Sequence, residues 1–329
     1  MKTIKWGILS TARIGTNHLV PAIHNSMHGS VQAIASRNSE RADDVAGDLN
    51  IPVAYGNYEA LLADGTIDAI YNSLPNHLHV PWTLKAMEAG KHVLCEKPIA
   101  LNAAEADRLL SEAKSFPHLK VMEAFMYRFH PQWKKSKDLV AQGDIGNLES
   151  IQSVFSYFND DPENIRNKPQ TGGGGLMDIG CYCISLSRFI FGREPDRVYG
   201  EIDTDADFGV DRKASGLLSF GDHTSTFTCS TQMHPYQRVH IFGSDGMIEV
   251  EIPFNAPTDR PTAIYLAKNG NKEKIEFQTV DQYELQVDAF NQAILNNTEV
   301  PTPLADAVNN MKVMDAIFKS NDEKKPVSL

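Results

Sequence analysis

The sequence lacks the features of several large classes of protein. It has only four cysteines in 329 residues, too few for a disulfide scaffold. It has no apolar run of about 18 residues, so we expect no membrane-spanning segment. It has 31 Lys and Arg residues and 42 Asp and Glu residues, which gives a net charge of −11. Because an acidic surface repels the phosphates of nucleic acids and anionic lipids, we expect neither as a partner.

Two further absences narrow the chemistry and the location. No group of His, Cys and carboxylate residues has the spacing of metal ligands, and we expect no metal. Cys181 and Cys183 lie in an apolar run and are interpreted as buried thiols. The chain starts directly in a strand-like segment, without the pattern of a secretory signal. We therefore expect a cytoplasmic protein.

The composition that remains is that of a globular protein long enough for two domains. Residues 1–122 alternate short apolar runs with helical patterns, which predicts a doubly wound α/β Rossmann domain with a parallel sheet. The expected strands there are 4–9, 31–36, 52–55, 67–73, 92–95 and 120–124. Residues 123–329 predict a second domain, of the α+β class, with a mainly antiparallel sheet. Its expected elements are a helix at 129–142, a strand at 148–158, a helix at 176–191, several strands between 198 and 278, and helices at 281–295 and 304–318.

A dinucleotide site is predicted directly after the first strand. The segment Ser10-Thr11-Ala12-Arg13-Ile14-Gly15 has the frame of G-x-G-x-x-G, with Ser10 and Ala12 in place of the first two glycines. Small residues let the backbone approach a pyrophosphate, and the start of the following helix offers N–H groups. We therefore assign this segment to cofactor binding. The alternative is an ordinary strand–turn–helix.

The end of the second strand predicts which cofactor is used. An NAD site usually has Asp or Glu there to bind the ribose 2′-hydroxyl, whereas this chain has Ser36 and Arg37. A serine hydroxyl and an arginine suit a 2′-phosphate, and Arg41 is a second cation nearby. We expect NADP, with NAD as the alternative. The competing interpretation of Arg37 is a solvated surface charge.

Further cofactor residues are expected after the fourth and fifth strands. Ligands of open α/β sheets lie beyond the carboxyl ends of the strands, near the switch in strand order. We place the nicotinamide near these two strand ends, whereas His79 is interpreted as an ordinary helix residue. The residues assigned to the cofactor here are Ser73, Leu74, Asn76, His77, Glu96 and Lys97.

Three motifs give a resemblance to a known family. The chain has Leu74-Pro75-Asn76-His77, Glu96-Lys97-Pro98 and, further on, the run from Gly173 to Tyr182. Together they resemble the signature of the glucose–fructose oxidoreductase / inositol dehydrogenase (Gfo/Idh/MocA) family over essentially the full length. Residues 123–131 resemble its branch with glucose–fructose oxidoreductase, dimeric dihydrodiol dehydrogenase and NADP-linked xylose dehydrogenases. The resemblance implies that residues 123–329 form a substrate-binding and dimerisation domain with a large, open, mainly antiparallel sheet, and that this sheet joins a homodimer or homotetramer.

The resemblance also implies a reaction. It places Lys97 and Tyr182 at the reacting centre of a hydride transfer between nicotinamide and a carbon of a sugar, polyol or diol. Tyrosine is too weak an acid to be a base at neutral pH by itself, but a nearby lysine ammonium favours the phenolate. Asp178 is four residues before Tyr182 on a predicted helix, and we expect it on the same face. We assign Asp178 to catalysis and substrate binding, with a helix N-terminal carboxylate as the alternative, and Arg128 to substrate binding.

Two rival functions remain open at this stage. One is a glycosidase of the same fold that oxidises and re-reduces its substrate with retained nicotinamide. The other is a regulator that senses a dinucleotide without catalysis. A proton-transfer pair is of no use to a sensor, so Lys97 and Tyr182 favour an enzyme.

Overall fold

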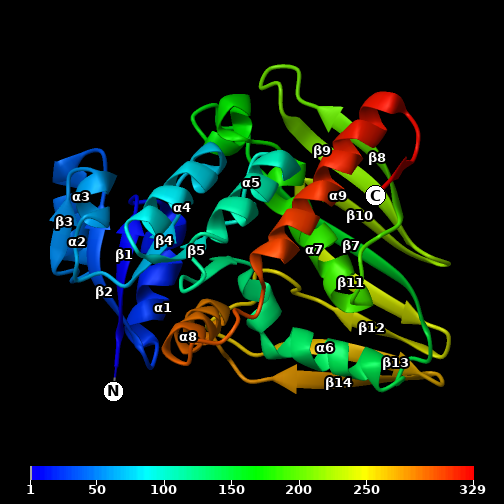
Figure 1. Ribbon diagram of the computed structural model, residues 1–329. Helices are drawn as coiled ribbons and strands as arrows, with labels where there is room; N and C mark the ends of the chain where they lie inside the picture. The colour runs from blue at the N-terminus through cyan, green and yellow to red at the C-terminus, as the bar shows by residue number, and fades with distance from the viewer. Residues whose placement is uncertain (1) are drawn as a thin grey trace. The chain divides into compact units, whose positions relative to one another are not determined.

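The computed structural model describes residues 2–329, and the chain forms two compact units (Figure 1). The first unit runs to Met126 and takes in Gln282–Val308. The second unit comprises Tyr127–Asp281 and Asn309–Leu329. No helix within the described residues is long and apolar enough to cross a membrane.

The first unit is built on a six-stranded parallel sheet in the order β3-β2-β1-β4-β5-β6. This is the Rossmann order, in which β1 and β4 are neighbours at the switch point where ligands bind. All six predicted strands are present, with ends shifted by no more than two residues. They are β1 (Ile4–Leu9), β2 (Gly29–Ala35), β3 (Val53–Tyr55), β4 (Ala69–Asn72), β5 (His92–Cys95) and β6 (Val121–Glu123).

Three helices of this unit, α2, α3 and α5, start where a short polar side chain satisfies one of the first backbone N–H groups. Asn38, Asn57 and Asn102 each accept a hydrogen bond from the backbone of the helix that follows. Gly90, just after the end of α4, has a φ of +76°, a conformation that glycine adopts readily. The helical segments are η1 (Gly15–Leu19), α1 (Val20–Asn25), α2 (Ser39–Asp48), α3 (Tyr58–Leu62), η2 (Asn76–Leu78), α4 (His79–Glu88), α5 (Ala103–Ala113) and α8 (Gln282–Leu295).

Helix α8 belongs to the first unit although it follows the second sheet in sequence. Phe290 packs its ring 5.6 Å from that of Trp6, and Asn291 Oδ1 accepts a hydrogen bond of 3.1 Å from Trp6 Nε1. Trp6 lies on β1 and is fully buried. The sequence-based division assigned everything after residue 122 to the second domain, because a local pattern does not reveal such a long-range contact.

The second unit is built on a nine-stranded sheet in the order β14-β13-β12-β11-β7-β10-β9-β8-β15. Neighbouring strands are antiparallel except β7 and β10, which are parallel. The strands are β7 (Leu148–Phe158), β8 (Arg197–Thr204), β9 (Asp211–Phe220), β10 (His223–Ser230), β11 (Gln232–Gly243), β12 (Gly246–Val250), β13 (Thr262–Lys268), β14 (Asn271–Phe277) and β15 (Val327–Ser328).

Helices cover one face of this sheet, and the opposite face is exposed. Helix α7 packs on β7 and β10, and α6 packs on β13 (Figure 1). Ile151 and Phe155 of β7 are buried on the covered face, while Gln152 between them is exposed. The helical segments are η3 (Met126–Phe129), α6 (Pro131–Ala141), η4 (Ile165–Asn167), η5 (Pro169–Thr171), η6 (Leu176–Gly180), α7 (Cys181–Phe191) and α9 (Leu304–Glu323), whose first residues lie in the first unit.

Candidate active site

The turn after β1 has the backbone that a dinucleotide-binding turn requires. Ser10 has a φ of +81°, the left-handed region in which the first glycine of the motif usually stands. Its hydroxyl compensates for the missing glycine, because Oγ accepts a hydrogen bond of 3.1 Å from the N–H of Ala12. Oγ also lies 3.2 Å from Ser73 Oγ, after β4. The two loops at the switch point are thus joined through side chains that the sequence assigned to the cofactor.

Small side chains continue along this turn. Ala12 and Ile14 are half-buried, Arg13 is exposed, and Gly15 opens η1. A Cβ atom on Gly15 would be in ordinary contact with the side chains of Ser73 and Tyr71, so the helix passes close to the sheet. The geometry fits a pyrophosphate at the start of η1.

The end of β2 presents the predicted 2′-phosphate residues. Ser36 is buried, and its Oγ accepts a hydrogen bond of 3.2 Å from the N–H of Asn38. Arg37 and Arg41 are exposed, and Arg41 Nε donates to Thr11 Oγ1 at 2.7 Å. The structure therefore brings the arginine of α2 to the phosphate-binding turn. Both cations and the serine border the same strand end.

The loop after β4 is held by side chains on its own strand and on α4. Ser73 Oγ donates to the carbonyl of Leu9 at 2.8 Å, and the N–H of Leu74 donates to Asn72 Oδ1 at 3.3 Å. Asn76 and His77 form the short turn η2 and are half-buried. Nδ1 of His77 is buried and has no hydrogen-bond partner among residues 2–329.

Sequence reasoning missed His79, which links two of the predicted loops. Its Nε2 lies 2.7 Å from the carbonyl oxygen of Leu74, and its Nδ1 lies 2.7 Å from that of Pro98. Burial lowers the pKa of His79 to about 4, although both carbonyls act in the opposite direction. The available signal was its place in Asn76-His77-Leu78-His79, at the start of a mostly buried helix.

The loop after β5 carries the predicted lysine. Glu96 is buried, and its Oε1 accepts a hydrogen bond of 2.5 Å from Tyr71 Oη. Its Oε2 accepts one of 3.3 Å from the N–H of Lys97. The peptide bond between Lys97 and Pro98 is cis. Glu96 thus accepts a hydrogen bond from the backbone of Lys97, the residue that follows it. The assignment of Glu96 to the cofactor stays a prediction.

In the second unit, Asp178 is surrounded by two residues that the sequence did not identify. Its Oδ2 accepts a hydrogen bond of 2.6 Å from Tyr157 Oη and lies 3.0 Å from Arg166 Nε. Burial and the charge of Asp178 raise the pKa of Tyr157 above its usual range. Tyr157 thus keeps its proton and donates a hydrogen bond to the carboxylate, and Arg166 brings a positive charge from the loop between β7 and η6.

Tyr182 lies within an aromatic cluster on the covered face of the second sheet. Its ring centroid is 5.4 Å from that of Phe254 and 5.8 Å from those of Phe155 and Tyr127, and Tyr182 is only 5% exposed. The predicted helix 176–191 is divided into a π-helical turn, η6, and the α-helix α7. Asp178 lies on the first part and Tyr182 on the second, and the face that they are expected to share stays a prediction.

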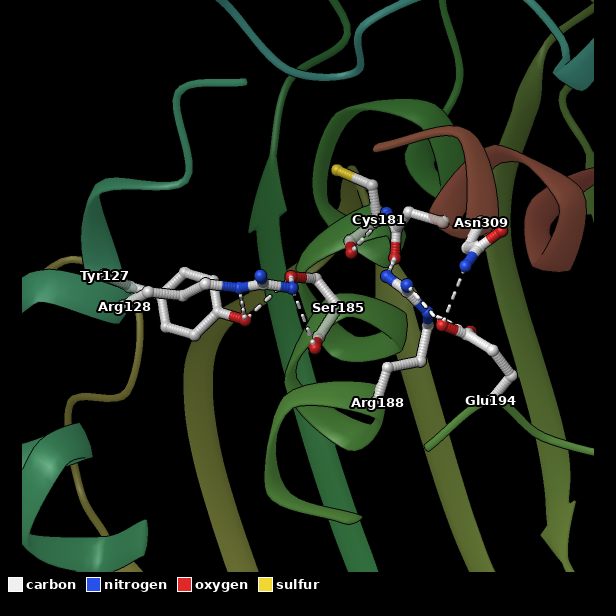
Figure 2. A network of polar contacts seen from close by, with 8 residues as sticks. Tyr127, Arg128, Cys181, Ser185, Arg188, Glu194 and Asn309 are labelled. Carbon is white, nitrogen blue, oxygen red and sulfur yellow. Dashed lines mark hydrogen bonds and ion pairs between the residues drawn. The ribbon is translucent and has the colours of Figure 1, made fainter. Parts of the chain in front are cut away.

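Arg128 is packed against α7. Figure 2 shows its guanidinium beside Ser185, whose Oγ accepts a hydrogen bond of 2.7 Å from Nη2. Tyr127 Oη lies 2.8 Å from the same Oγ, and Arg128 is 9% exposed. On the other side of α7, Arg188 pairs with Glu194 (Figure 2). Arg128 thus supports the helix that carries Tyr182, and its assignment to substrate binding stays a prediction.

The predicted residues fall into two groups. Lys97 and the cofactor residues belong to the first unit, while Arg128, Asp178 and Tyr182 belong to the second. In the first unit, hydrogen bonds join Ser10 to Ser73 and Arg41 to Thr11. The pairing of Lys97 with Tyr182 stays a prediction.

Comparison with known proteins identifies the family. Residues 4–124 match the model of the oxidoreductase family with an NAD-binding Rossmann fold, and residues 133–249 match the GFO/IDH/MocA C-terminal domain. The chain belongs to the Gfo/Idh/MocA family of oxidoreductases. The predicted family, the two-domain fold class and the nicotinamide-dependent oxidoreductase activity are therefore confirmed.

Several relatives are similar over almost the entire chain. An uncharacterized oxidoreductase of Rhizobium meliloti is 41% identical and covers 97% of both chains. A D-xylose 1-dehydrogenase (NADP(+)) of Haloferax volcanii is 37% identical, over 98% of this chain and 99% of its own. Among solved structures, a 3-ketoreductase from Actinomadura kijaniata in complex with NADP and TDP-benzene has a TM-score of 0.91. It is 28% identical and covers 97% of this chain and 98% of its own.

Proposed function

We propose that this protein is an NADP-dependent oxidoreductase that transfers a hydride between nicotinamide and a carbon of a sugar or related polyol or diol. The observation that carries the proposal is the switch point of the first sheet. There the left-handed turn at Ser10, the loop at Ser73 and the strand end at Ser36 and Arg37 form one polar rim. Such a rim suits a dinucleotide with an additional phosphate.

The preference for NADP depends on charge at the end of β2. Ser36 and Arg37 replace the carboxylate that would repel a 2′-phosphate, and Arg41 lies at the phosphate-binding turn. NADP(+) is the cofactor in the name of the Haloferax volcanii relative, and NADP is bound in the 3-ketoreductase structure. Both support this choice of cofactor.

The chemistry requires a base as well as the cofactor. When bound, NADP accepts or delivers the hydride, and the chain must move the hydroxyl proton. Tyr182 is buried among aromatic rings, where an isolated phenolate is unfavourable. We infer that Lys97 provides the compensating positive charge and that Tyr182 exchanges the proton with the substrate hydroxyl.

The substrate class follows from the polar side chains in the second unit. Tyr157, Arg166 and Asp178 form a hydrogen-bonded group that joins the loop after β7 to the helix of Tyr182. Such a group suits a substrate with several hydroxyls, because each hydroxyl both donates and accepts hydrogen bonds. The names of the D-xylose dehydrogenase and the 3-ketoreductase support a carbohydrate substrate.

We further propose a cytoplasmic homodimer or homotetramer assembled through the second sheet. The strand register places Phe158, Leu217 and Tyr236 on the face opposite α7, where they are 60%, 37% and 47% exposed. Exposed apolar side chains on a broad sheet face favour association. The partner expected on this face is a second copy of the chain.

A panel of aldoses, polyols and cyclic diols tests the proposed function. Each compound is incubated with NADP or NAD, and reduced nicotinamide is followed by its absorbance. Net reduction of NADP with at least one sugar is expected. Sugar release from a glycoside with retained nicotinamide and no net reduction indicates the glycosidase instead. NADP binding without turnover of any compound indicates the regulator.

A further inference from the structure

A buried aspartate lies at the start of the helix that carries Asp178 and Tyr182. Asp211 is the first residue of β9 and is 6% exposed. Its Oδ2 accepts a hydrogen bond of 2.6 Å from the N–H of Leu176, the first residue of η6. The first N–H groups of a helix have no partner within it, and a carboxylate is well placed to accept from them. Asp211 therefore anchors this helix to the sheet.

The glycines before η6 are required by this anchor. Gly174 has a φ of +113°, and a Cβ atom there would overlap Oδ1 of Asp211. A Cβ atom on Gly173 would overlap the carbonyl of Arg166, which accepts the N–H of Gly174 at 2.8 Å. The chain thus enters η6 through a space that only glycine fits, between the carboxylate and the loop that carries Arg166.

Charge alone does not explain why an aspartate stands here. Burial raises the pKa of the Asp211 carboxyl to about 7, against the lowering effect of the N–H groups of Leu176 and Gly175. Asp178 and Cys229 are the other titratable groups that interact with it. Burying a carboxylate is unfavourable, and the N–H groups of Leu176 and Gly175 offset part of that cost.

The anchored turn is not a regular α-helix. η6 is π-helical, a form that occurs mainly as single turns, often at functional sites. Asp178 lies within this turn, and Tyr182 follows two residues after its end. A shift at Leu176 is therefore transmitted along the helix to both side chains.

We propose that Asp211 is a positioning residue for the reaction, which sets the placement of Asp178 and Tyr182 by holding the first turn of their helix. The proposal rests on the proposed function of Tyr182. Asp211 acts through the backbone of Leu176 and has no contact with the reacting atoms in this scheme. Its loss is expected to lower kcat while leaving NADP binding, which belongs to the first unit, unchanged.

The test compares Asp211→Ala with Asp211→Asn. Asparagine keeps an oxygen that accepts from Leu176, whereas alanine removes it. Asp211→Ala is expected to lower kcat roughly tenfold to a hundredfold, the effect of small misplacements of reacting groups. Asp211→Asn is expected to stay within a few-fold of wild type, with the same Kd for NADP. The matched control is Asp196→Ala, which removes a 2.6 Å hydrogen bond from a backbone N–H, that of Gly221, in the same unit.

The outcomes separate this proposal from the proposed function. Wild-type kcat in a folded Asp211→Ala overturns the proposal, as does an equal loss in Asp211→Asn and Asp211→Ala. If Asp211→Ala does not fold, Asp211→Glu is measured, because it keeps the charge and displaces the carboxylate from Leu176. Wild-type kcat in that variant also overturns the proposal. If wild type itself turns over no sugar with NADP, the proposed function fails instead.

Discussion

Acidification provides a test of how His79 holds the two cofactor loops together. Its two ring nitrogens each lie 2.7 Å from a carbonyl oxygen, those of Leu74 and Pro98. A carbonyl only accepts hydrogen bonds, so a neutral ring donates to one of them, while an imidazolium donates to both. Burial lowers the pKa of His79 from 6.5 to about 4, which favours the neutral ring.

The consequence is a defined loss of stability at low pH. Below about pH 6.5 a neutral His79 takes up a proton when the chain unfolds. The contribution of neutral His79 to the free energy of unfolding is therefore fully present above about pH 6.5 and is lost as the pH falls toward 4. Between about pH 7.5 and pH 5, these pKa values convert to about 2 kcal/mol of unfolding free energy. Glutamine at this position does not titrate, so this part of the pH dependence should disappear.

The assay is urea denaturation of wild type, His79→Gln and His24→Gln at both pH values. His24 is exposed on α1 and is the matched control. The decrease in unfolding free energy from the higher to the lower pH should be about 2 kcal/mol smaller in His79→Gln than in wild type. His24→Gln should show the same decrease as wild type. If His79 is instead an imidazolium that donates to both carbonyls, its folded pKa lies above 6.5. Wild type would then gain stability relative to His79→Gln on acidification, and our reasoning would be refuted.

Three further predictions concern the cofactor, the assembly and the lysine. Arg37→Ala should lower kcat/KM for NADP roughly ten- to a hundredfold with little change for NAD, because a charge-assisted phosphate contact is worth about 1.5–3 kcal/mol. Equal losses with both cofactors would contradict a contact between Arg37 and the 2′-phosphate. Light scattering at micromolar concentration should give the mass of a dimer or tetramer, and a sharp monomer mass contradicts assembly through the second sheet. Lys97→Met should lower kcat at least as much as Tyr182→Phe, since it removes the charge that favours the phenolate and a donor to the substrate; a smaller loss indicates that Lys97 is not required for proton transfer.

The first sheet was predictable from the sequence because its signals are local. Each buried parallel strand is a short apolar run bounded by turns, and β1 and β5 match their predicted bounds. The second sheet was predictable as a class but not in its pairing. The parallel neighbours β7 and β10 are separated by about 70 residues, and no local pattern indicates their contact.

The candidate site shows the same division. Ser10 and Arg41 were identified from motif positions, but their hydrogen bonds to Ser73 and Thr11 appear only in the fold. His79 and Asp211 were missed because each acts on backbone atoms of a distant segment. Motif positions indicate which side chains to assign to the chemistry, whereas the fold is needed to show which side chains hold the segments around them in place.

The most direct test of the account is the pH dependence of substrate oxidation in wild type and Tyr182→Phe. The variant keeps the ring and its contacts with Phe155 and Phe254 but cannot ionise. We predict that the wild-type rate rises with pH through a group that titrates well below free tyrosine. In Tyr182→Phe this rise should be absent, and kcat should fall about 10²–10⁴-fold with NADP affinity intact. Near-normal turnover with an unchanged pH profile would contradict the role of Tyr182 as the base.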